Sequence, residues 1–288
     1  MEISASSRRI LAGLLESRTG QQLGSGRRWR VDTALAPILR DGGFENVDQL
    51  VSRIASGQAP ALAERAIEAL LNNETYFYRD RLPFDLLMAG PLKRLEAARA
   101  GTKRISIWSV GCSTGQELYS MAMAFAEQGT RWRGWTIDLV GSDISRSAIE
   151  RARAGSYSQF EVQRGLPINL LLKYFTQVGD QWQIAPAIRA LVDYKPLNLI
   201  KDFSQLGSFD IIFCRNVLIY FDTPTKGEVL KRMACALPDD GALLLGAAET
   251  VIGITDALIP HPEHRGLYVP HRPAAVQTPA PLRVAAGR

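Results

Sequence analysis

Residues 105–125 read ISIWSVGCSTGQELYSMAMAF and hold a strand pattern, a glycine-bearing turn and a helix pattern, in that order. Apolar residues over 105–110 predict a short strand, and residues 118–125 predict a helix. A strand that leads through such a turn into a helix is typical of nucleotide-binding α/β sheets, where the first turn approaches the ligand most closely. The stretch therefore predicts the start of an α/β domain.

The alternation of strand and helix patterns continues downstream of this unit. Strands that alternate with helices predict a doubly wound, mostly parallel sheet of the Rossmann-like class. Residues 157–187 are less regular, with a helix through Tyr174 and a hairpin strand at 181–184, so we expect an insertion or a lid over the sheet edge. The further elements are predicted as strands at 135–140, 191–194, 209–214 and 242–245, and as helices at 146–154 and 225–236.

The sequence before the sheet is helical. Residues 31–99 form a succession of short helix patterns with glycine and proline punctuation, and Asn72-Asn73 ends one of them. We predict a small all-helical domain over residues 1–98, in which 1–30 is a candidate flexible segment. An α/β domain over 99–272 and a disordered, Pro- and Ala-rich tail over 273–288 complete the predicted organisation.

Composition narrows the class of protein. The chain has 288 residues, a net charge of +5, 46% hydrophobic and 22% charged residues, which is ordinary for a folded globular protein. No run approaches the ~20 apolar residues of a membrane helix. Charges at Glu16 and Arg18 follow the short apolar patch near the start, so we expect no signal peptide. Basic residues come in small groups within ordinary helix or loop sequence, which favours solvated faces over a nucleic-acid surface.

The cysteines and histidines do not predict a disulfide framework or a metal site. Cys112, Cys214 and Cys235 are odd in number and lie in apolar sequence, which favours a reducing cytoplasm. The three histidines fall in a Pro-rich stretch at 261–271 without a nearby cysteine or paired carboxylate. A solvated loop is therefore favoured there over a metal site.

The turn after the first strand and one acidic residue indicate an adenosine-containing ligand. Gly111 and Gly115 allow the backbone to come close to a ligand, and the following helix offers free N–H groups. The spacing is G-x-x-x-G and not the G-x-G-x-x-G of a dinucleotide site, which disfavours a nicotinamide or flavin cofactor. Asp143 ends the second strand, where a carboxylate can bind both ribose hydroxyls. Its alternative role is an N-cap for the helix that begins near Ser145.

Three separated blocks of the sequence resemble the CheR family, the chemoreceptor glutamate methyltransferases. The blocks are NNETYFYRD at 72–80, WSVGCSTGQE at 108–117 and FCRNVLIYFD at 213–222, and the resemblance covers roughly residues 50–268. The chain departs from the family at Tyr78, where Phe is common, and at Gln116, where a second acidic residue is frequent. It also reads GAAE at 246–249 where relatives often read GHSE.

The resemblance implies S-adenosylmethionine as the cofactor and S-adenosylhomocysteine as the product. The implied partner is the cytoplasmic domain of a methyl-accepting chemoreceptor or a related signalling protein. Arg79 and Tyr220 would be the catalytic residues that orient the glutamate carboxylate, as segment 73–79 closes over the donor. The candidate donor-binding residues are Asn73, Thr75, Arg79, Gly111, Glu117, Asp143, Asn198, Leu199, Arg215 and Asn216.

Elementary chemistry agrees with this resemblance. A glutamate side chain with a pKa of about 4.3 is already ionised at neutral pH, so its methylation needs no strong general base. Alternatives stay open for single residues: Arg79 could pair with Asp80 or Asp85, Tyr220 could be a core aromatic, and Glu249 could be a strand-end charge.

For the whole chain, we predict protein-glutamate O-methyltransfer that tunes chemotaxis-type signalling. The alternatives are methylation of another protein or of a small carboxylate, and a non-catalytic signalling scaffold that binds S-adenosylmethionine. We expect a cytoplasmic monomer that binds no nucleic acid and has no membrane insertion.

Overall fold

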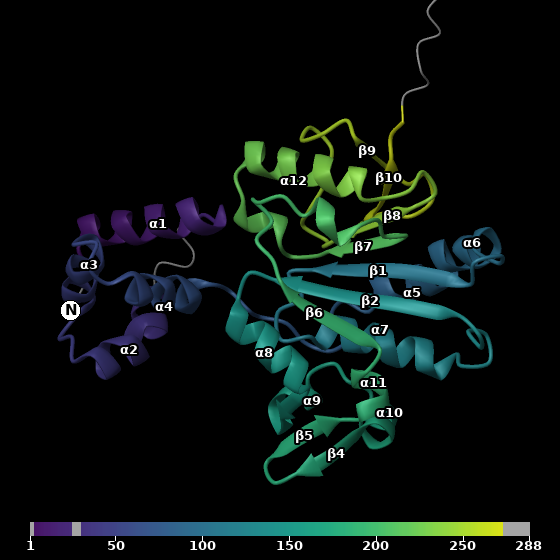
Figure 1. The fold of residues 1–288 in the computed structure, drawn as a ribbon, viewed down its shortest axis with the longest axis horizontal. Coiled ribbons are helices and arrows are strands. Elements are labelled where there is room, and N and C mark those ends of the chain that lie inside the picture. Colours follow the sequence, from purple (N-terminus) through teal and green to yellow (C-terminus); the bar gives the residue numbers. More distant parts are fainter. Residues whose placement is uncertain (1–2, 25–29, 273–288) are drawn as a thin grey trace, which may run out of the picture.

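The structure is a computed structural model that describes residues 3–24 and 30–272. A helical bundle lies beside a central sheet, and a smaller sheet lies below that central sheet in the view of Figure 1. The predicted disordered tail at 273–288 lies outside the described residues, as do residues 1–2 and 25–29 of the candidate flexible segment.

Four helices form the bundle. Ser4 and Asn46 accept backbone N–H hydrogen bonds at the starts of two of them, as N-cap residues do. Leu11, Leu35 and Leu50 are fully buried in a hydrophobic core that the bundle does not share with the sheet. The bundle helices are α1 (Ala5–Thr19), α2 (Arg30–Gly42), α3 (Val47–Ala55) and α4 (Pro60–Leu70).

Two more helices, α5 (Leu82–Ala89) and α6 (Pro91–Ala98), follow a linking segment at 71–81. Their residues Phe84 and Leu92 are buried in the core of the central sheet. The predicted domain limit at residue 98 stays a prediction, but the apolar packing of the bundle ends with α4.

The central sheet has seven strands in the order β6-β2-β1-β7-β8-β10-β9. The first five of these are parallel, and β10 and β9 extend the sheet antiparallel at one edge. This arrangement confirms the predicted doubly wound, mostly parallel α/β fold. Val110 pairs with both Ser142 and Cys214, so the carboxyl ends of three strands meet. The strands are β1 (Arg104–Val110), β2 (Thr136–Asp143), β6 (Val192–Pro196), β7 (Ile211–Cys214), β8 (Ala242–Leu245), β9 (Leu258–Pro260) and β10 (Leu267–Pro270).

Helices cover both faces of this sheet (Figure 1). Ile105 and Ile107 of β1 share a core with α7 and α8, whereas Trp108 and Val110 share the opposite core with α12. The alternation follows from the period of two residues along a strand. The covering helices are α7 (Gln116–Glu127), α8 (Arg146–Ala154), α11 (Pro186–Arg189) and α12 (Thr223–Cys235).

The irregular stretch at 157–187 belongs to a separate three-stranded sheet in the order β3-β5-β4. Phe77, Tyr157 and Phe175 contact one another edge to face and join this small sheet to the main core. The predicted insertion is present, but it is no lid over the cavity described below, because none of its residues lines it. Its elements are β3 (Ser156–Ser158), α9 (Gln159–Gln163), α10 (Ile168–Tyr174), β4 (Phe175–Val178) and β5 (Gln181–Ile184).

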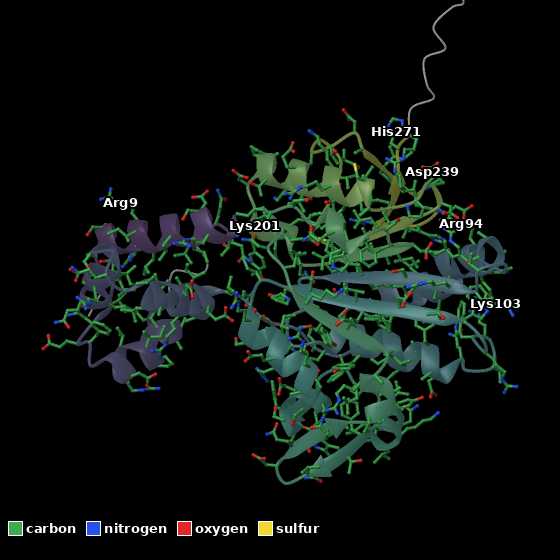
Figure 2. The ribbon with its side chains drawn as sticks, viewed as in Figure 1. Arg9, Arg94, Lys103, Lys201, Asp239 and His271 are labelled. Carbon is green, nitrogen blue, oxygen red and sulfur yellow. The ribbon has the colours of Figure 1, made fainter. Side chains whose placement is uncertain are left out.

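The basic groups of the sequence are dispersed over the molecule. Figure 2 places Arg9 on the helical bundle and places Arg94 and Lys103 at the opposite end of the molecule. Among the described residues, the basic group at Arg9 therefore lies apart from the one at Arg94 and Lys103. Over residues 3–24 and 30–272, no helix has both the length and the apolar character that are needed to cross a membrane.

Candidate active site

A cavity lies at the carboxyl ends of β1, β2 and β7, and the linking segment after α4 crosses it. Ligands of doubly wound sheets bind at this edge. The structure brings the predicted site residues together from five separate parts of the chain. Those that line the cavity are Asn73, Thr75, Arg79, Gly111, Glu117, Asp143, Asn198, Leu199, Arg215, Asn216 and Tyr220.

The turn between β1 and α7 has a left-handed backbone at three positions. Gly111, Ser113 and Gly115 have φ values of 62°, 51° and 94°. A Cβ at Gly111 would collide with Val217, and a Cβ at Gly115 would lie 2.6 Å from the Tyr194 hydroxyl oxygen. Gly111 also lines the cavity, as expected, whereas Gly115 is required by the packing of Tyr194.

Asp143 is a buried carboxylate at the end of β2. Its Oδ2 accepts the Ser113 N–H at 2.8 Å and its Oδ1 accepts the Ser145 N–H at 2.9 Å. Each oxygen keeps a second lone pair for a ligand hydroxyl. Burial raises the pKa of Asp143, and the two N–H groups offset only part of the rise. Ser145, and not Asp143, is the N-cap of α8, which removes the alternative reading of this carboxylate.

The helical bundle contacts this part of the site through α4. Glu68 Oε1 accepts hydrogen bonds from the Ser145 hydroxyl at 2.6 Å and from the Ser147 N–H at 3.1 Å. A carboxylate at the first turn of α8 is favoured by the free N–H groups and the positive end of the helix dipole. The Ser113 hydroxyl donates to the Asn73 carbonyl at 2.6 Å, which ties the glycine turn to the linking segment.

Arg215 is the central charge of the cavity wall. Its Nη1 lies 2.8 Å from Glu117 Oε2, and its Nη2 lies 2.7 Å from Asp80 Oδ2. Nη2 also donates to the Arg79 carbonyl at 2.9 Å, so the buried guanidinium holds the end of the linking segment. The other Glu117 oxygen accepts the Ser109 hydroxyl at 2.8 Å. Glu117 therefore faces the cavity as a carboxylate that the protein itself already binds on both oxygens.

Arg79 lines the cavity and is only half-buried. Its Nη1 donates to the Glu74 carbonyl at 3.0 Å, and its guanidinium lies 5.6 Å from the centre of the Tyr76 ring. Asp80 was one of the two carboxylates with which Arg79 could have paired at the surface. In the structure Asp80 pairs with Arg215 instead. The guanidinium of Arg79 is thus held by a carbonyl and a ring, both of which leave its charge available to an anion.

Tyr220 ends a short 3₁₀ helix at Leu218–Tyr220 that follows β7. Its ring is half-buried and lines the cavity, whereas the next residue, Phe221, is 5% exposed and belongs to the core. Asn72 Nδ2 donates to the Tyr220 hydroxyl oxygen at 2.5 Å. Tyr220 is therefore a cavity residue and not a core aromatic, and Asn72 fixes the position of its hydroxyl.

The end of α1 forms a wall of the cavity that was not predicted from the sequence. Thr19 and Gln21, at the end of that helix, line the cavity. Gly20 has a φ of 74° and caps α1, and a Cβ there would lie 2.5 Å from Ile200. The Asn198 side chain donates to the Arg18 carbonyl at 2.8 Å, which holds the end of α1 against the sheet domain. The glycine after an amphipathic helix was the available signal for this turn.

Among the described residues, the cavity has neither a thiolate nor a metal cluster. Burial raises the pKa of the Cys112 thiol well above its ordinary value, so this lining residue is not a thiolate at neutral pH. In the part of the chain that the structure describes, no three His, Cys, Asp or Glu side chains are grouped as metal ligands. The His261 and His264 rings stack with their centres 4.9 Å apart.

Comparison with known families identifies the fold and its ligand. The family described as CheR methyltransferase, SAM binding domain, matches residues 73–265. The chain belongs to the CheR methyltransferase family. S-adenosylmethionine is accordingly the cofactor of this CheR-family methyltransferase, and the enzyme class predicted from the sequence is confirmed.

Relatives of this CheR-family chain span most of its length. It is 37% identical over 246 residues to chemotaxis protein methyltransferase 1 of Pseudomonas aeruginosa, covering 84% of this chain and 89% of the relative. It is 37% identical over 257 residues to chemotaxis protein methyltransferase 1 of Vibrio cholerae, covering 88% and 92%. Among solved structures, magnesium protoporphyrin IX methyltransferase from Synechocystis PCC 6803 with bound SAM aligns with a TM-score of 0.30 and 17% identity, covering 61% of this chain and 64% of that one.

The residues of the cavity fit S-adenosylmethionine. Among the described residues, three buried atoms of its lining have no hydrogen-bond partner, namely Gln21 Oε1, Arg215 Nε and Asn216 Oδ1. Buried polar groups are rarely left unsatisfied in folded proteins. Amino groups of the cofactor can donate to the two oxygens, its carboxylate can accept from Arg215, and its ribose hydroxyls can donate to Asp143.

Two departures of this CheR-family chain have simple structural settings. The Gln116 side chain is buried, and its Oε1 accepts the Thr114 hydroxyl at 2.8 Å, so it closes the glycine turn from within. Ala247 and Ala248 are exposed. The Glu249 carboxylate accepts backbone N–H groups near the cavity, so it is more than a strand-end charge.

Proposed function

We propose that this CheR-family methyltransferase transfers a methyl group from S-adenosylmethionine to glutamate side chains of methyl-accepting chemoreceptors. The observation that carries the proposal is the cavity itself, where Arg79 and Tyr220 face a site that Asp143 and Arg215 help to form. The relatives named chemotaxis protein methyltransferase support the chemoreceptor as the partner. The cytoplasmic domain of such a receptor is the part that the enzyme meets, in the cytoplasm.

The reaction joins two groups that need little activation. S-adenosylmethionine supplies a methyl group on a positively charged sulfur, and sulfur keeps the electron pair of the broken C–S bond. One glutamate oxygen forms the new bond to that carbon, so the products are a methyl ester and S-adenosylhomocysteine, and no proton moves. Because the glutamate is already ionised at neutral pH, the task of the protein is alignment and exclusion of water.

Arg79 and Tyr220 are the residues we assign to the glutamate. A guanidinium and a phenol can each donate a hydrogen bond to a carboxylate oxygen and so set its direction of attack. Arg79 is half-buried, which limits how tightly it holds the anion, and an overly tight ion pair would slow the transfer. Asn72 donates a hydrogen bond to the Tyr220 hydroxyl oxygen and so fixes its position.

The remaining lining residues are assigned to the donor. Asp143 would bind the ribose, Asn198 and Leu199 would lie beside the adenine, and Glu117 would favour the positive charge of the donor. Asn73 and Thr75 belong to the segment that crosses the cavity. A methyl ester removes one negative charge from the receptor, and such a charge change can shift a two-state signalling equilibrium.

A methyl-transfer assay against receptors from the same cell tests the proposal. Tritiated methyl groups should pass from S-adenosylmethionine to receptor protein, and mild alkali should release them as methanol, because a glutamyl ester hydrolyses under those conditions. Peptide mapping should then place the label on glutamate. Alkali-stable label would contradict the ester, label on other proteins alone would favour a different protein substrate, and S-adenosylhomocysteine binding without any transfer would favour a signalling scaffold.

A further inference from the structure

The carboxylate of Glu249 binds the backbone of a different loop, the turn that follows β7. Glu249 lies in the loop after β8, and both of its oxygens accept N–H groups of the turn or of its own loop. Five backbone N–H groups converge on this one side chain. Oε2 accepts from Asn216 at 2.8 Å and from Gly246 at 2.8 Å, and Oε1 accepts from Val217 at 2.9 Å, Leu218 at 2.8 Å and Ile219 at 3.3 Å.

The turn needs such a partner because of its own conformation. Asn216 has a φ of 59°, in the left-handed region, and the short 3₁₀ helix begins two residues later at Leu218. The first N–H groups of any helix have no acceptor within the helix. Successive N–H groups that point the same way form an anion-binding concavity, and a carboxylate that fills it accepts charge-assisted hydrogen bonds.

The loop after β8 packs closely around the Glu249 carboxylate. A Cβ at Gly246 would lie 2.7 Å from Glu249 Oε2 and 3.0 Å from the Asn216 nitrogen. Gly246 is therefore needed for the loop after β8 to approach the turn after β7. The sequence departure at Ala247 and Ala248 leaves this contact intact, because both residues are exposed.

The turn that Glu249 holds forms part of the cavity wall. Asn216, Val217 and Tyr220 line the cavity, whereas Glu249 does not. We propose that Glu249 is a positioning residue for methyl transfer, which fixes the turn at 215–220 so that Asn216 meets the donor and the Tyr220 hydroxyl meets the glutamate. This inference rests on the proposed function for its catalytic readout.

Glu249→Gln tests the inference with the smallest change of shape. The amide nitrogen would face N–H donors where a carboxylate oxygen now accepts them, so the turn should loosen. We expect kcat to fall at least tenfold, the Kd of S-adenosylhomocysteine to rise about threefold to tenfold, and the receptor KM to stay within twofold. Backbone amides at 216–219 should exchange with deuterium at least tenfold faster than in the natural protein.

The matched control is Glu161→Gln. Glu161 also accepts a backbone N–H, from Ser158 at 2.9 Å, but it does so at the start of α9 and does not line the cavity. This variant should keep the natural kcat and Kd. In Glu249→Ala, added formate should restore part of kcat, whereas chloride at equal ionic strength should not, because only the carboxylate can refill the concavity.

Two outcomes would overturn the inference. The first is a Glu249→Gln protein whose kcat and amide exchange at 216–219 both stay within twofold of the natural values. The second is a loss of activity that only reflects a loss of folded protein, so that activity per folded molecule is unchanged and formate restores nothing. Glu249 would then have a purely structural role. The exchange and Kd measurements need no receptor, so they test the positioning of the turn even if receptors are not methylated.

Discussion

Arg215 Nη1 lies 2.8 Å from Glu117 Oε2, and the side chain of Arg215 is fully buried. This pair joins the start of α7 to the turn after β7, since Glu117 lies in the first turn of α7 and Arg215 directly follows β7. The second partner of Arg215, Asp80, is 44% exposed, so solvent screens that contact. The stability of the pocket should therefore depend mainly on the buried Arg215–Glu117 pair.

Arg215→Ala should destabilise the protein by roughly 3–5 kcal/mol, because it leaves the Glu117 carboxylate without its counter-ion in a buried site. Urea unfolding measures the change. Arg65→Ala serves as the control, since both side chains of its ion pair with Asp41 are exposed and its loss should change stability by no more than about 0.5 kcal/mol. A loss below about 1 kcal/mol in Arg215→Ala would contradict the assignment.

Tyr220→Phe should lower kcat about tenfold to a hundredfold and leave the Kd of S-adenosylhomocysteine within twofold, because it removes one hydrogen bond to the glutamate and keeps the ring. Single-turnover methylation and calorimetry give the two quantities. Tyr174→Phe is the control, since the Tyr174 hydroxyl donates to Glu127 at the C-terminal end of α7 and Tyr174 does not line the cavity. An unchanged kcat in Tyr220→Phe would reject the catalytic role.

Asp143 should make donor binding sensitive to acid. Burial raises the pKa of Asp143 above its ordinary value of 3.8, so protonation begins at a higher pH than for an exposed aspartate. The contribution of this group to folding stability is present below pH 3.8 and is lost as the pH rises through the raised pKa. Ribose binding has the opposite pH dependence: it strengthens as the pH rises, because the ribose hydroxyls donate to the ionised Asp143 carboxylate.

The affinity for S-adenosylhomocysteine should accordingly weaken as the pH falls toward the raised pKa of Asp143, and should approach a tenfold loss per pH unit below it. Asp143→Asn should bind more weakly at neutral pH and show a flatter profile. Calorimetry between about pH 5 and pH 8 measures both. If the affinity changed with pH in the same way in Asp143→Asn and in the natural protein, a group other than Asp143 would control the pH dependence.

Gln21→Ala should raise the Kd of S-adenosylhomocysteine about threefold to tenfold, which is the usual effect of one lost hydrogen bond. The reason is that Gln21 Oε1 is buried at the cavity without a protein partner and is expected to accept from the ligand. The neighbouring Gln22→Ala is the control, since Gln22 is exposed. Equal affinities in both variants would show that Gln21, in the turn after α1, does not contact the donor.

The parallel sheet explains why so much of the site could be predicted. Residues 111–117 follow β1, Asp143 ends β2 and Arg215 follows β7, and the carboxyl ends of neighbouring parallel strands lie at one edge. Each block could be assigned to the end of a predicted parallel strand, and this assignment was enough to predict that the blocks lie close together. The roles of the individual residues toward donor and glutamate stay predictions, which the variants above test.

Contacts between distant parts of the chain were not predictable in the same way. Asn198 and Arg18 are 180 residues apart, and nothing in either local pattern indicates the other. The hairpin of β9 and β10 was missed because its strands are three and four residues long and each ends in proline, which is unusual inside a strand. Glu249 was underestimated for a related reason, since its partners are backbone N–H groups, which carry no sequence signal.

The contact between Glu68 and the start of α8 bears on how small a working enzyme can be made. Asn73, where the matched SAM-binding region begins, comes after Glu68 and after the whole of α1. A protein trimmed to residues 73–265 would keep six of the seven strands of the central sheet and lose β10. It would also lack Glu68, the carboxylate at the first turn of α8, and the cavity wall formed by Thr19 and Gln21. We therefore expect full-strength donor binding to require the N-terminal bundle in addition to the matched SAM-binding region.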